Sequence, residues 1–214
     1  MAHSIADIRR DYILQSLNEV DVNANAIDQF STWWNEAIKA GIDDVNAMTL
    51  ATASKEGIPS ARIVLLKGYD KKGFVFFTNY QSQKGKDLAN NPHGALLFFW
   101  KELERQIRLD GIVMKISAEE SDTYFQSRPA ASRIGAWASA QSSVISDRKV
   151  IENNFLMYEE KFGIDNIPRP EHWGGYVLKP RLLEFWQGRS NRLHDRIQYE
   201  LQLDGDWKIE RLAP

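Results

Sequence analysis

Residues 60–78 of the chain, SARIVLLKGYDKKGFVFFT, decide the fold. They hold two runs rich in β-branched and aromatic residues, 60–68 and 73–78, and the turn signal Asp70-Lys71-Lys72-Gly73 separates them. Two strands joined by so short a turn lie antiparallel. The stretch therefore predicts an antiparallel strand pair within a larger sheet.

Runs of the same kind flank this pair. We expect further strands at about 47–54, 94–100, 104–117, 173–178, 181–187, 192–202 and 206–211. Apolar residues at helical spacing predict helices at 4–18, 25–40, 119–127, 130–139 and 147–162, with Asn25 or Asp28 as the cap of the second. No repeat or linker marks a second domain. We therefore expect one α+β domain over residues 1–214, mainly β with flanking helices, that closes as an antiparallel barrel or sandwich.

The composition limits the classes of protein that fit. The 214 residues are 43% hydrophobic, enough for one substantial core, and the formal net charge of -2 gives no overall attraction to nucleic acid or anionic lipid. With no cysteine, the chain has no disulfide, thiolate nucleophile or Cys-ligated metal. Residues 1–12 lack the apolar run of a signal peptide, and no apolar stretch reaches membrane-spanning length. We expect a soluble, cytoplasmic protein in which any anion site is local.

The pattern Arg192-Leu193-His194-Asp195-Arg196 is the sharpest local signal. In a strand, successive side chains point to opposite faces, so Arg192, His194 and Arg196 would share one face. Cationic side chains in such a row repel one another unless an anionic or electron-rich group covers them, and a phosphorylated or flavin ligand meets that need. The alternative is an exposed edge strand whose charges discourage aggregation.

Residues 78–86, TNYQSQKGK, run from a strand end into a short helix that Ser82 can cap. Lysines in its first turn oppose the helix dipole unless an anion lies at the positive end, which favours a phosphate site. An ordinary surface turn is the alternative.

Cations also stand at both ends of the apolar run Arg62 to Lys67, and strict alternation puts them on opposite faces. Either a bulge redirects one of them, or they contact different parts of a ligand, or both are charges at strand ends that reach solvent. No dinucleotide fingerprint, Walker loop, metal-ligand spacing or Ser-His-Asp arrangement is present, which disfavours those enzyme classes.

Many of these segments together resemble the pyridoxine 5′-phosphate oxidase family, in order and over almost the whole chain. They are Arg9-Arg10-Asp11-Tyr12, Arg62-Ile-Val-Leu-Leu-Lys67, Phe77-Thr78-Asn79, Glu104-Arg105-Gln106, Tyr124-Phe125-x-Ser127-Arg128-Pro129, Ile134-Gly135-Ala136-Trp137, Gln141-Ser142-Ser143, Trp173-Gly174-Gly175, Glu184-Phe185-Trp186-Gln187-Gly188, Arg192-Leu193-His194-Asp195-Arg196 and Arg211-Leu212-Ala213-Pro214.

The resemblance implies a homodimeric split β-barrel over about 45–214, after a helical segment over about 1–40, with FMN at the subunit interface. The implied cofactor-binding residues are Arg62, Ile63, Val64, Leu65, Leu66, Lys67, Phe77, Thr78, Gln83, Lys84, Gln106, Gln141, Ser142, Trp186 and Arg196. Of these, Gln141, Ser142, Trp186 and Arg196 would come from the partner subunit.

The resemblance also implies the reaction, which is oxidation of pyridoxine 5′-phosphate and pyridoxamine 5′-phosphate to pyridoxal 5′-phosphate. Dioxygen reoxidises the flavin to give hydrogen peroxide, and the amine releases ammonia. The implied substrate-binding residues are Arg9, Arg10, Asp11, Tyr12, Lys67, Tyr124, Arg128, Ser132, Arg192 and His194. Arg192 and His194 are the implied catalytic pair, in which Arg192 orients the substrate and His194 positions it.

One departure from the family pattern stands out. Where the family usually has Ser-Arg-Lys, this chain reads Ser82-Gln83-Lys84, so one cation that faces the phosphate is missing. Two alternatives stay open: a split-barrel flavoprotein of another activity, such as a flavin reductase or a nicotinamide-dependent oxidoreductase, and a carrier that binds flavin or vitamer without turnover.

Overall fold

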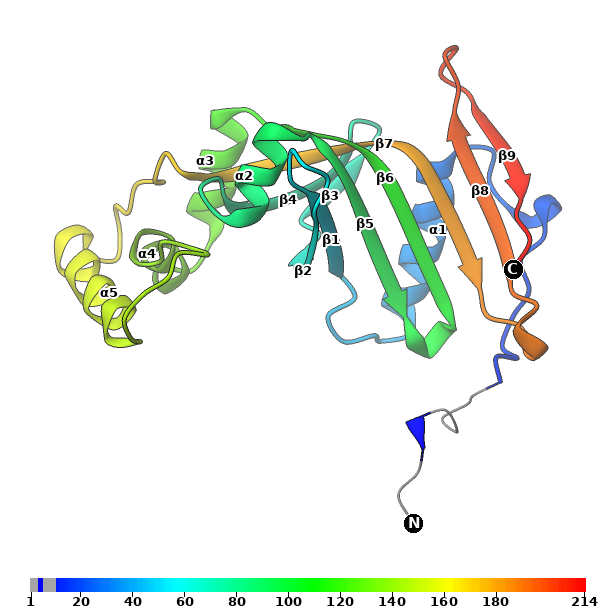
Figure 1. The fold of residues 1–214 in the computed structure, drawn as a ribbon, viewed down its shortest axis with the longest axis horizontal. Helices are drawn as coiled ribbons and strands as arrows, with labels where there is room; N and C mark the ends of the chain where they lie inside the picture. Colours follow the sequence, from blue (N-terminus) through cyan, green and yellow to red (C-terminus); the bar gives the residue numbers. More distant parts are fainter. Residues whose placement is uncertain (1–3, 6–10) are drawn as a thin grey trace. The chain divides into compact units, whose positions relative to one another are not determined.

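The computed structural model describes residues 4–5 and 11–214, which form a nine-stranded sheet with flanking helices (Figure 1). The strands are β1 Ala47–Ala53, β2 Pro59–Leu65, β3 Gly68–Asp70, β4 Gly73–Asn79, β5 His93–Trp100, β6 Arg105–Lys115, β7 Trp173–Gln187, β8 Asp195–Leu201 and β9 Trp207–Arg211. The helices are α1 Ala26–Lys39, α2 Gln83–Asn90, α3 Ala118–Ser127, α4 Ala130–Ala138 and α5 Lys149–Phe162, with 3-10 turns η2 Glu19–Asp21, η3 Lys101–Leu103 and η4 Ser190–Arg192. None of the helices in the described residues is long and apolar enough to cross a bilayer.

Hydrogen-bonded neighbours in the sheet follow the order β2-β1-β5-β6-β7-β4-β3, while β8 pairs with β7 and β9 pairs with β8. The β3–β4, β7–β8 and β8–β9 pairs, whose strands follow each other in the chain, are antiparallel as expected, and the β4–β7 pair is antiparallel too. Of the expected pair 60–68 and 73–78, the part that forms is β3 with β4, while β2 pairs with β1. The antiparallel sheet with flanking helices confirms the predicted fold class.

The chain divides into two compact units. The first contains the described residues up to Thr49, with Ala95–Gly111 and Pro180–Pro214, and the second contains Leu50–Gly94 and Ile112–Lys179. Strands β1, β5, β6 and β7 contribute residues to both units.

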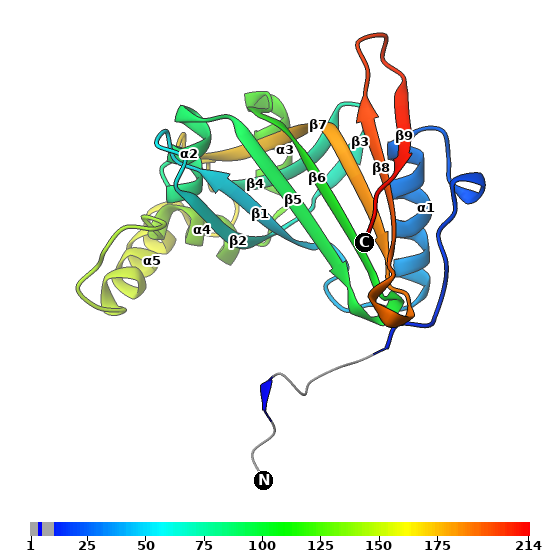
Figure 2. The same ribbon diagram turned by 45° about the vertical axis from the view of Figure 1, so that its right-hand side comes forward.

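In the first unit, α1 lies against the β7–β8 part of the sheet (Figures 1 and 2). The helix begins where the Asn25 side chain accepts hydrogen bonds from the backbone N–H groups of Ile27 and Asp28, at 2.8 and 3.4 Å. Its apolar side is buried, and the Trp33 ring meets Phe185 of β7 edge to face at a centroid distance of 5.2 Å. Asn25, not Asp28, is therefore the cap.

In the second unit, α3, α4 and α5 pack around a small apolar core. Phe125, Ile134, Ile167 and Trp173 form its buried centre. A capping box fixes the start of α3, because the Ser117 side chain and the Glu120 side chain each accept a hydrogen bond from the other's backbone N–H.

The predicted helix over 4–18 is wrong for residues 11–18, and residues 6–10 lie outside the described part. Residues 11–18 have no helical turn, and three of their backbone N–H groups bond to distant side-chain carboxylates instead. Glu104 Oε2 accepts from Ile13 and Leu14 at 2.9 and 3.1 Å, and Asp195 Oδ2 accepts from Leu17 at 3.1 Å. This segment, residues 11–18, is called the strap below.

The two strands predicted at 173–178 and 181–187 are one strand, β7. Pro180, which has no N–H to donate, falls between the two predicted strands. The strand survives because β4 pairs with β7 up to Leu178, while β8 pairs with it only from Leu182. Pro180 stands between the two ladders, where neither of them needs its missing donor. The short strand β3 was not predicted.

Candidate active site

Most of the predicted site residues line one pocket in the second unit. The pocket has a volume of about 490 Å³. It is lined by Ile63, Val64, Leu65, Lys67, Phe77, Thr78, Lys84, Tyr124, Arg128, Pro129, Ser132, Gln141 and Trp173. The end of β2, strand β4, the first turn of α2 and the α3–α4 junction therefore meet at this pocket.

Stacked aromatic rings form part of its wall. The ring of Phe77 on β4 lies nearly parallel to that of Tyr124 on α3, with centroids 3.8 Å apart. Trp173 at the start of β7 continues the stack at 5.5 Å from Phe77. Trp173 lies both in the apolar core of the second unit and at the pocket.

Lys84 brings a positive charge into the pocket from the first turn of α2, which Ser82 caps as predicted. Its side chain is buried, and Nζ donates to Gln141 Oε1 at 2.7 Å, an oxygen that also accepts from Thr78 Oγ1 at 3.2 Å. Burial lowers the pKa of Lys84, and the nearby charge of Arg62 lowers it further. Within the described residues no carboxylate neutralises Lys84, so an anionic ligand would be favoured here.

Gln141 differs from the expected division between subunits. The resemblance assigned it to the partner, whereas Gln141 here lies against Lys84 of its own chain. It follows α4 in a tight turn in which its N–H donates to Ser139 O at 2.9 Å, and this turn brings the side chain back to α2. The neighbouring Ser142 is exposed with a φ of 70°.

Arg128 is the second cation of the pocket. Its guanidinium lies 4.6 Å above the Trp173 ring, and its Nη1 atom is buried with no hydrogen-bond partner among the described residues. Burial lowers the pKa of Arg128. A buried donor without an acceptor costs about 1–3 kcal/mol, so the geometry favours an oxyanion at Nη1.

Arg62 points away from this pocket, as strand alternation predicts. Its Nη1 donates to Thr52 Oγ1 at 2.8 Å and to Leu50 O at 3.3 Å, both on β1. Burial lowers the pKa of Arg62, and the charge of Asp87 partly offsets this effect. Lys67 beyond the end of β2 lines the pocket instead.

Gln83 is exposed at the start of α2, and its Nε2 donates to Asp87 Oδ1 at 2.8 Å. It does not line the pocket. Asp87 also accepts from Thr52 Oγ1 at 2.7 Å. A contact between Gln83 and a cofactor stays a prediction, as do contacts from buried Leu66 and half-buried Gln106.

The predicted donor row at 192–196 is wrong as a strand face. Strand β8 begins at Asp195, and Asn191 and Arg192 before it have φ angles of 56° and 62°. These left-handed residues form a turn, so the alternation of a strand applies to Arg196 but not to Arg192 or His194. Arg192 is exposed and His194 half-buried.

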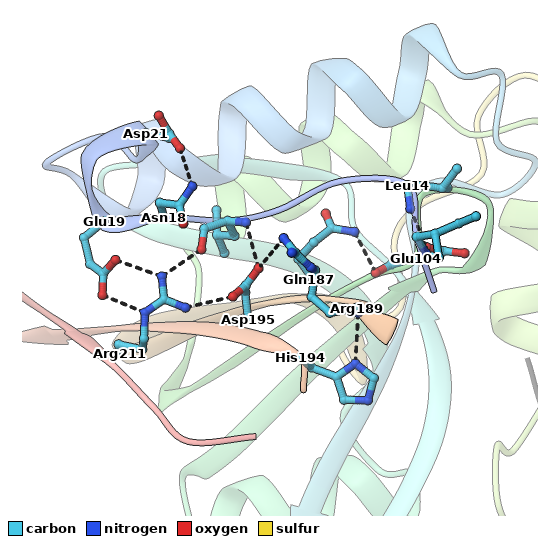
Figure 3. A network of polar contacts seen from close by, with 12 residues as sticks. Leu14, Asn18, Glu19, Asp21, Glu104, Gln187, Arg189, His194, Asp195 and Arg211 are labelled. Atoms are coloured by element: carbon cyan, nitrogen blue, oxygen red, sulfur yellow. Dashed lines mark hydrogen bonds and ion pairs between the residues drawn. The ribbon is translucent and has the colours of Figure 1, made fainter. Parts of the chain in front are cut away.

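His194 belongs to a second cluster, in the first unit. Its ring lies 4.6 Å from that of Trp186 on β7 and 5.8 Å from that of Tyr12 in the strap. The backbone N–H of Arg189 donates to His194 Nδ1 at 3.1 Å (Figure 3). Burial and the charge of Arg192 lower the pKa of His194, against a smaller opposite effect of Asp195.

Arg196 already has protein partners. Its Nε donates to Oε1 of the buried Glu184 at 2.7 Å, and its Nη1 donates to Ala213 O at 2.8 Å. Arg108, on the same side of β6 as Gln106, forms the second ion pair of Glu184 at 2.9 Å. Arg196 thus differs from Lys84 and Arg128, whose charges have no carboxylate partner among the described residues.

A polar network holds the strap beside this cluster (Figure 3). Asp195 accepts from the Leu17 N–H and pairs with Arg189 and Arg211 at 3.3 and 2.8 Å. Arg211 also pairs with Glu19 at 2.7 Å. Asp195, Glu104 and Arg211 stand inside segments that the family resemblance singled out, but sequence alone gave no reason to link them to residues 11–19.

Some predicted residues lie outside these clusters. Arg9 and Arg10 are outside the described residues, and Asp11 is exposed. The described residues contain no group of three His, Asp or Glu side chains arranged to hold a metal ion.

Two family models match the chain. Residues 34–160 match the family model described as pyridoxamine 5′-phosphate oxidase. Residues 173–214 match the model described as the pyridoxine 5′-phosphate oxidase C-terminal dimerisation region.

Relatives match over nearly the whole chain. A pyridoxine/pyridoxamine 5′-phosphate oxidase of Cyanothece sp. is 56% identical over 100% of both chains. Pyridoxine/pyridoxamine 5′-phosphate oxidase 1 of Ralstonia nicotianae is 59% identical over 99% of both.

Solved structures share the fold. PhzG from Burkholderia lata, in complex with tetrahydrophenazine-1-carboxylic acid, superposes with a TM-score of 0.87 at 30% identity, over 94% of this chain and 99% of PhzG. A pyridoxamine 5′-phosphate oxidase-related, FMN binding protein from Nostoc punctiforme has a TM-score of 0.71 at 16% identity, over 90% of this chain and 100% of that protein, which shows the fold alone. On the two family matches and the full-length identities, the chain belongs to the pyridoxine/pyridoxamine 5′-phosphate oxidase family.

Proposed function

We propose that the chain is an FMN-dependent oxidase that converts pyridoxine 5′-phosphate and pyridoxamine 5′-phosphate to pyridoxal 5′-phosphate. The observation that carries this function is the pocket of the second unit. It holds the cations Lys67, Lys84 and Arg128, and Arg128 Nη1 has no acceptor among the described residues. Full-length relatives at 56% and 59% identity are named for the same two substrates.

The lining of the pocket fits a flavin nucleotide. Lys84 and Thr78 would hold the phosphate of FMN, since both now share the single oxygen Gln141 Oε1 and could turn to a stronger acceptor. Ile63 to Leu65 would cover the flavin ring. FMN, when bound, supplies the hydride acceptor and passes the electrons to dioxygen, which yields hydrogen peroxide.

The phosphate of the substrate would lie at Arg128. Its unpaired Nη1 and the ammonium of Lys67 provide charge, and the hydroxyl groups of Tyr124 and Ser132 can donate further hydrogen bonds. Binding through the phosphate fixes one end of the vitamer, so the pyridine ring is held in one orientation.

Arg192, His194 and Trp186 would complete the site in a homodimer, as the family resemblance implies. The match of residues 173–214 to a dimerisation region supports the dimer. Arg192 would place a permanent positive charge at the substrate ring. The aromatic rings of Trp186 and Tyr12, which pack around His194, would exclude water from one side of the substrate.

Peroxide production by the purified chain, loaded with FMN, tests this function. We expect hydrogen peroxide and pyridoxal 5′-phosphate from both substrates, and ammonia from the amine. Pyridoxamine without its phosphate is the matched control, and its KM should be higher by at least about tenfold because Arg128 and Lys67 lose their charged partner.

Two results would overturn the proposal in different ways. A protein that binds FMN and both vitamers but releases no peroxide is a carrier. A protein that reduces or oxidises other substrates, and does not distinguish pyridoxamine 5′-phosphate from pyridoxamine, is a split-barrel flavoprotein of another specificity.

A further inference from the structure

The turn over residues 189–194 folds back on itself beside the aromatic cluster of the first unit. Asn191 and Arg192 both have left-handed φ angles, 56° and 62°, and reverse the chain within the short η4 turn. The reversal brings the backbone N–H of Arg189 to 3.1 Å from His194 Nδ1 (Figure 3). The contact joins main chain to side chain, so it does not depend on the type of side chain at position 189.

This hydrogen bond restricts the proton of the imidazole. A backbone N–H can only donate, so Nδ1 must present its lone pair. In a neutral imidazole that accepts at Nδ1, the proton is on Nε2. A proton on Nδ1 would set two donors against each other at 3.1 Å and would break the contact.

Packing fixes the direction of the ring as well. Trp186 lies 4.6 Å from the His194 ring at an interplanar angle of 42°, and Tyr12 lies 5.8 Å away at 67°. Tyr12 packs closely against the backbone at Gly188, since a Cβ added to Gly188 would lie 2.7 Å from Tyr12 Cβ. The ring is therefore held on two sides while Nδ1 is held by the backbone.

We infer that the 189–194 turn locks His194 in the neutral Nε2–H tautomer, so that His194 acts as a hydrogen-bond donor to an oxygen of the bound vitamer and not as a general base. The inference rests on the proposed function for the identity of the ligand, but the tautomer itself does not depend on it. In this assignment the backbone N–H of Arg189 is the positioning group, and Asn191 and Arg192 make its position possible.

The charges around His194 agree with a neutral ring. Arg189 and Arg192, both in the turn, are cationic. Asp195 on β8 is anionic, but it is paired with Arg189 and Arg211. Burial and Arg192 lower the pKa of His194. The neutral ring is thus favoured over the protonated one more than in a free histidine, and protonation at Nδ1 would break the contact.

Nitrogen NMR of the FMN-loaded protein, with 15N-labelled histidine rings, tests the tautomer directly. The His194 signal is identified by its loss in His194→Gln. We expect one unprotonated Nδ1 and one protonated Nε2 at neutral and higher pH. An Nδ1–H tautomer, an averaged pair of nitrogens, or a ring that is already charged at neutral pH would each overturn the lock.

Three variants separate the effect of the turn's backbone from the effects of its side chains. Asn191→Gly keeps the left-handed conformation and should preserve the single tautomer, whereas Asn191→Val disfavours that conformation and should give a mixed tautomer. Arg189→Ala removes the ion pair with Asp195 but keeps the backbone N–H, and should leave the tautomer unchanged. A mixed tautomer in Arg189→Ala or Asn191→Gly would contradict the assignment even if Asn191→Val fails to fold.

Kinetics separate a donor from a base. A glutamine amide can place its N–H near the position of Nε2, whereas the shorter asparagine cannot. For a donor, His194→Gln should change kcat/KM by less than about fivefold, while His194→Asn should lower it by at least about tenfold, mainly through KM. Equal, large losses of kcat in both variants would show a base. A protein with the expected tautomer but no turnover would reject the proposed function and leave the lock standing.

Discussion

Arg128 is the residue on which the proposed substrate site depends most. In the absence of a ligand its buried Nη1 has no partner among the described residues, so this side chain costs folding free energy that binding would recover. Sites of this kind exchange stability for affinity.

Replacing Arg128 should therefore separate stability from binding. We expect Arg128→Met to leave the thermal midpoint of the ligand-free protein unchanged or higher, since Met keeps most of the contact with Trp173 and removes a buried charge. The KM for both phosphorylated substrates should rise about 10- to 100-fold, because a charge-assisted hydrogen bond contributes about 1.5–3 kcal/mol. A lower midpoint with an unchanged KM would show that Arg128 is structural.

Gln83 gives a second test at the scale of one residue. Its amide donates to Asp87 at 2.8 Å, so an arginine at this position has a carboxylate within reach before it meets any phosphate. We expect Gln83→Arg to pair with Asp87 and to change the FMN affinity by less than about threefold at low and high salt. A gain of tenfold or more that fades at high salt would instead place residue 83 at the FMN phosphate, as the family pattern suggests.

Among the elements, α2 depends on a close approach to the backbone. A Cβ on Gly85 would lie 2.2 Å from Tyr80 O, so only glycine allows the first turn of α2, and Lys84 with it, to pack as it does. We expect Gly85→Ala to lower the free energy of unfolding by about 1–3 kcal/mol and to weaken FMN binding. Gly135→Ala is the control, because Gly135 lies in helix α4 with free space around it, and should stabilise by about 0.5–1 kcal/mol. Denaturant titration and FMN titration of both variants measure the difference, and equal effects would contradict the role of Gly85.

The strap has its own pH dependence. Hydrogen bonds from Arg211 lower the pKa of Glu19 from 4.5 to about 2. Because the folded pKa is depressed, the stabilising effect is complete above pH 4.5 and is lost as the pH falls towards 2. We expect amide hydrogen exchange in residues 11–18 to accelerate relative to intrinsic rates over that range.

Arg211→Gln should produce the same fast exchange at neutral pH. Lys208→Gln is the matched control, since it breaks an exposed ion pair with Glu210 in the same strand and does not touch the strap. Slow exchange in the Arg211 variant, or fast exchange in the Lys208 variant, would show that the strap is held by other contacts.

Sequence periodicity was sufficient for elements that depend on local signals. The caps at Asn25 and Ser82 and the turns between strands predicted α1, α2 and most strand positions. It failed in two places. Glu104 and Asp195, far along the chain, keep the strap from forming a helix, and the left-handed residues Asn191 and Arg192 delay the start of β8 until after His194. The pocket residues came from the family resemblance, because no local pattern links Lys84 to Gln141, 57 residues later.

For the molecule as a whole, the proposed site links cofactor binding to assembly. If FMN binds between two copies of the chain, ligand and dimer stabilise each other by mass action. We expect the thermal midpoint to rise with protein concentration and with excess FMN. Light scattering should show a dimer, and the FMN content should be one per chain. A monomer that retains one FMN per chain would reject the shared site, and loss of FMN on dilution without dissociation would reject the linkage.

The division of the sequence between the two units has a consequence for how the protein folds. The first unit is assembled from three separate stretches, and its strap is fixed by an N–H of Leu17 on Asp195, 178 residues away. Contacts at such separation require the closure of a long loop before they return any free energy, which slows folding. We therefore expect the strap to take its final place late, after β7 and β8 have paired. We expect the pocket of the second unit, whose segments lie nearer to one another in the sequence, to form before the strap does.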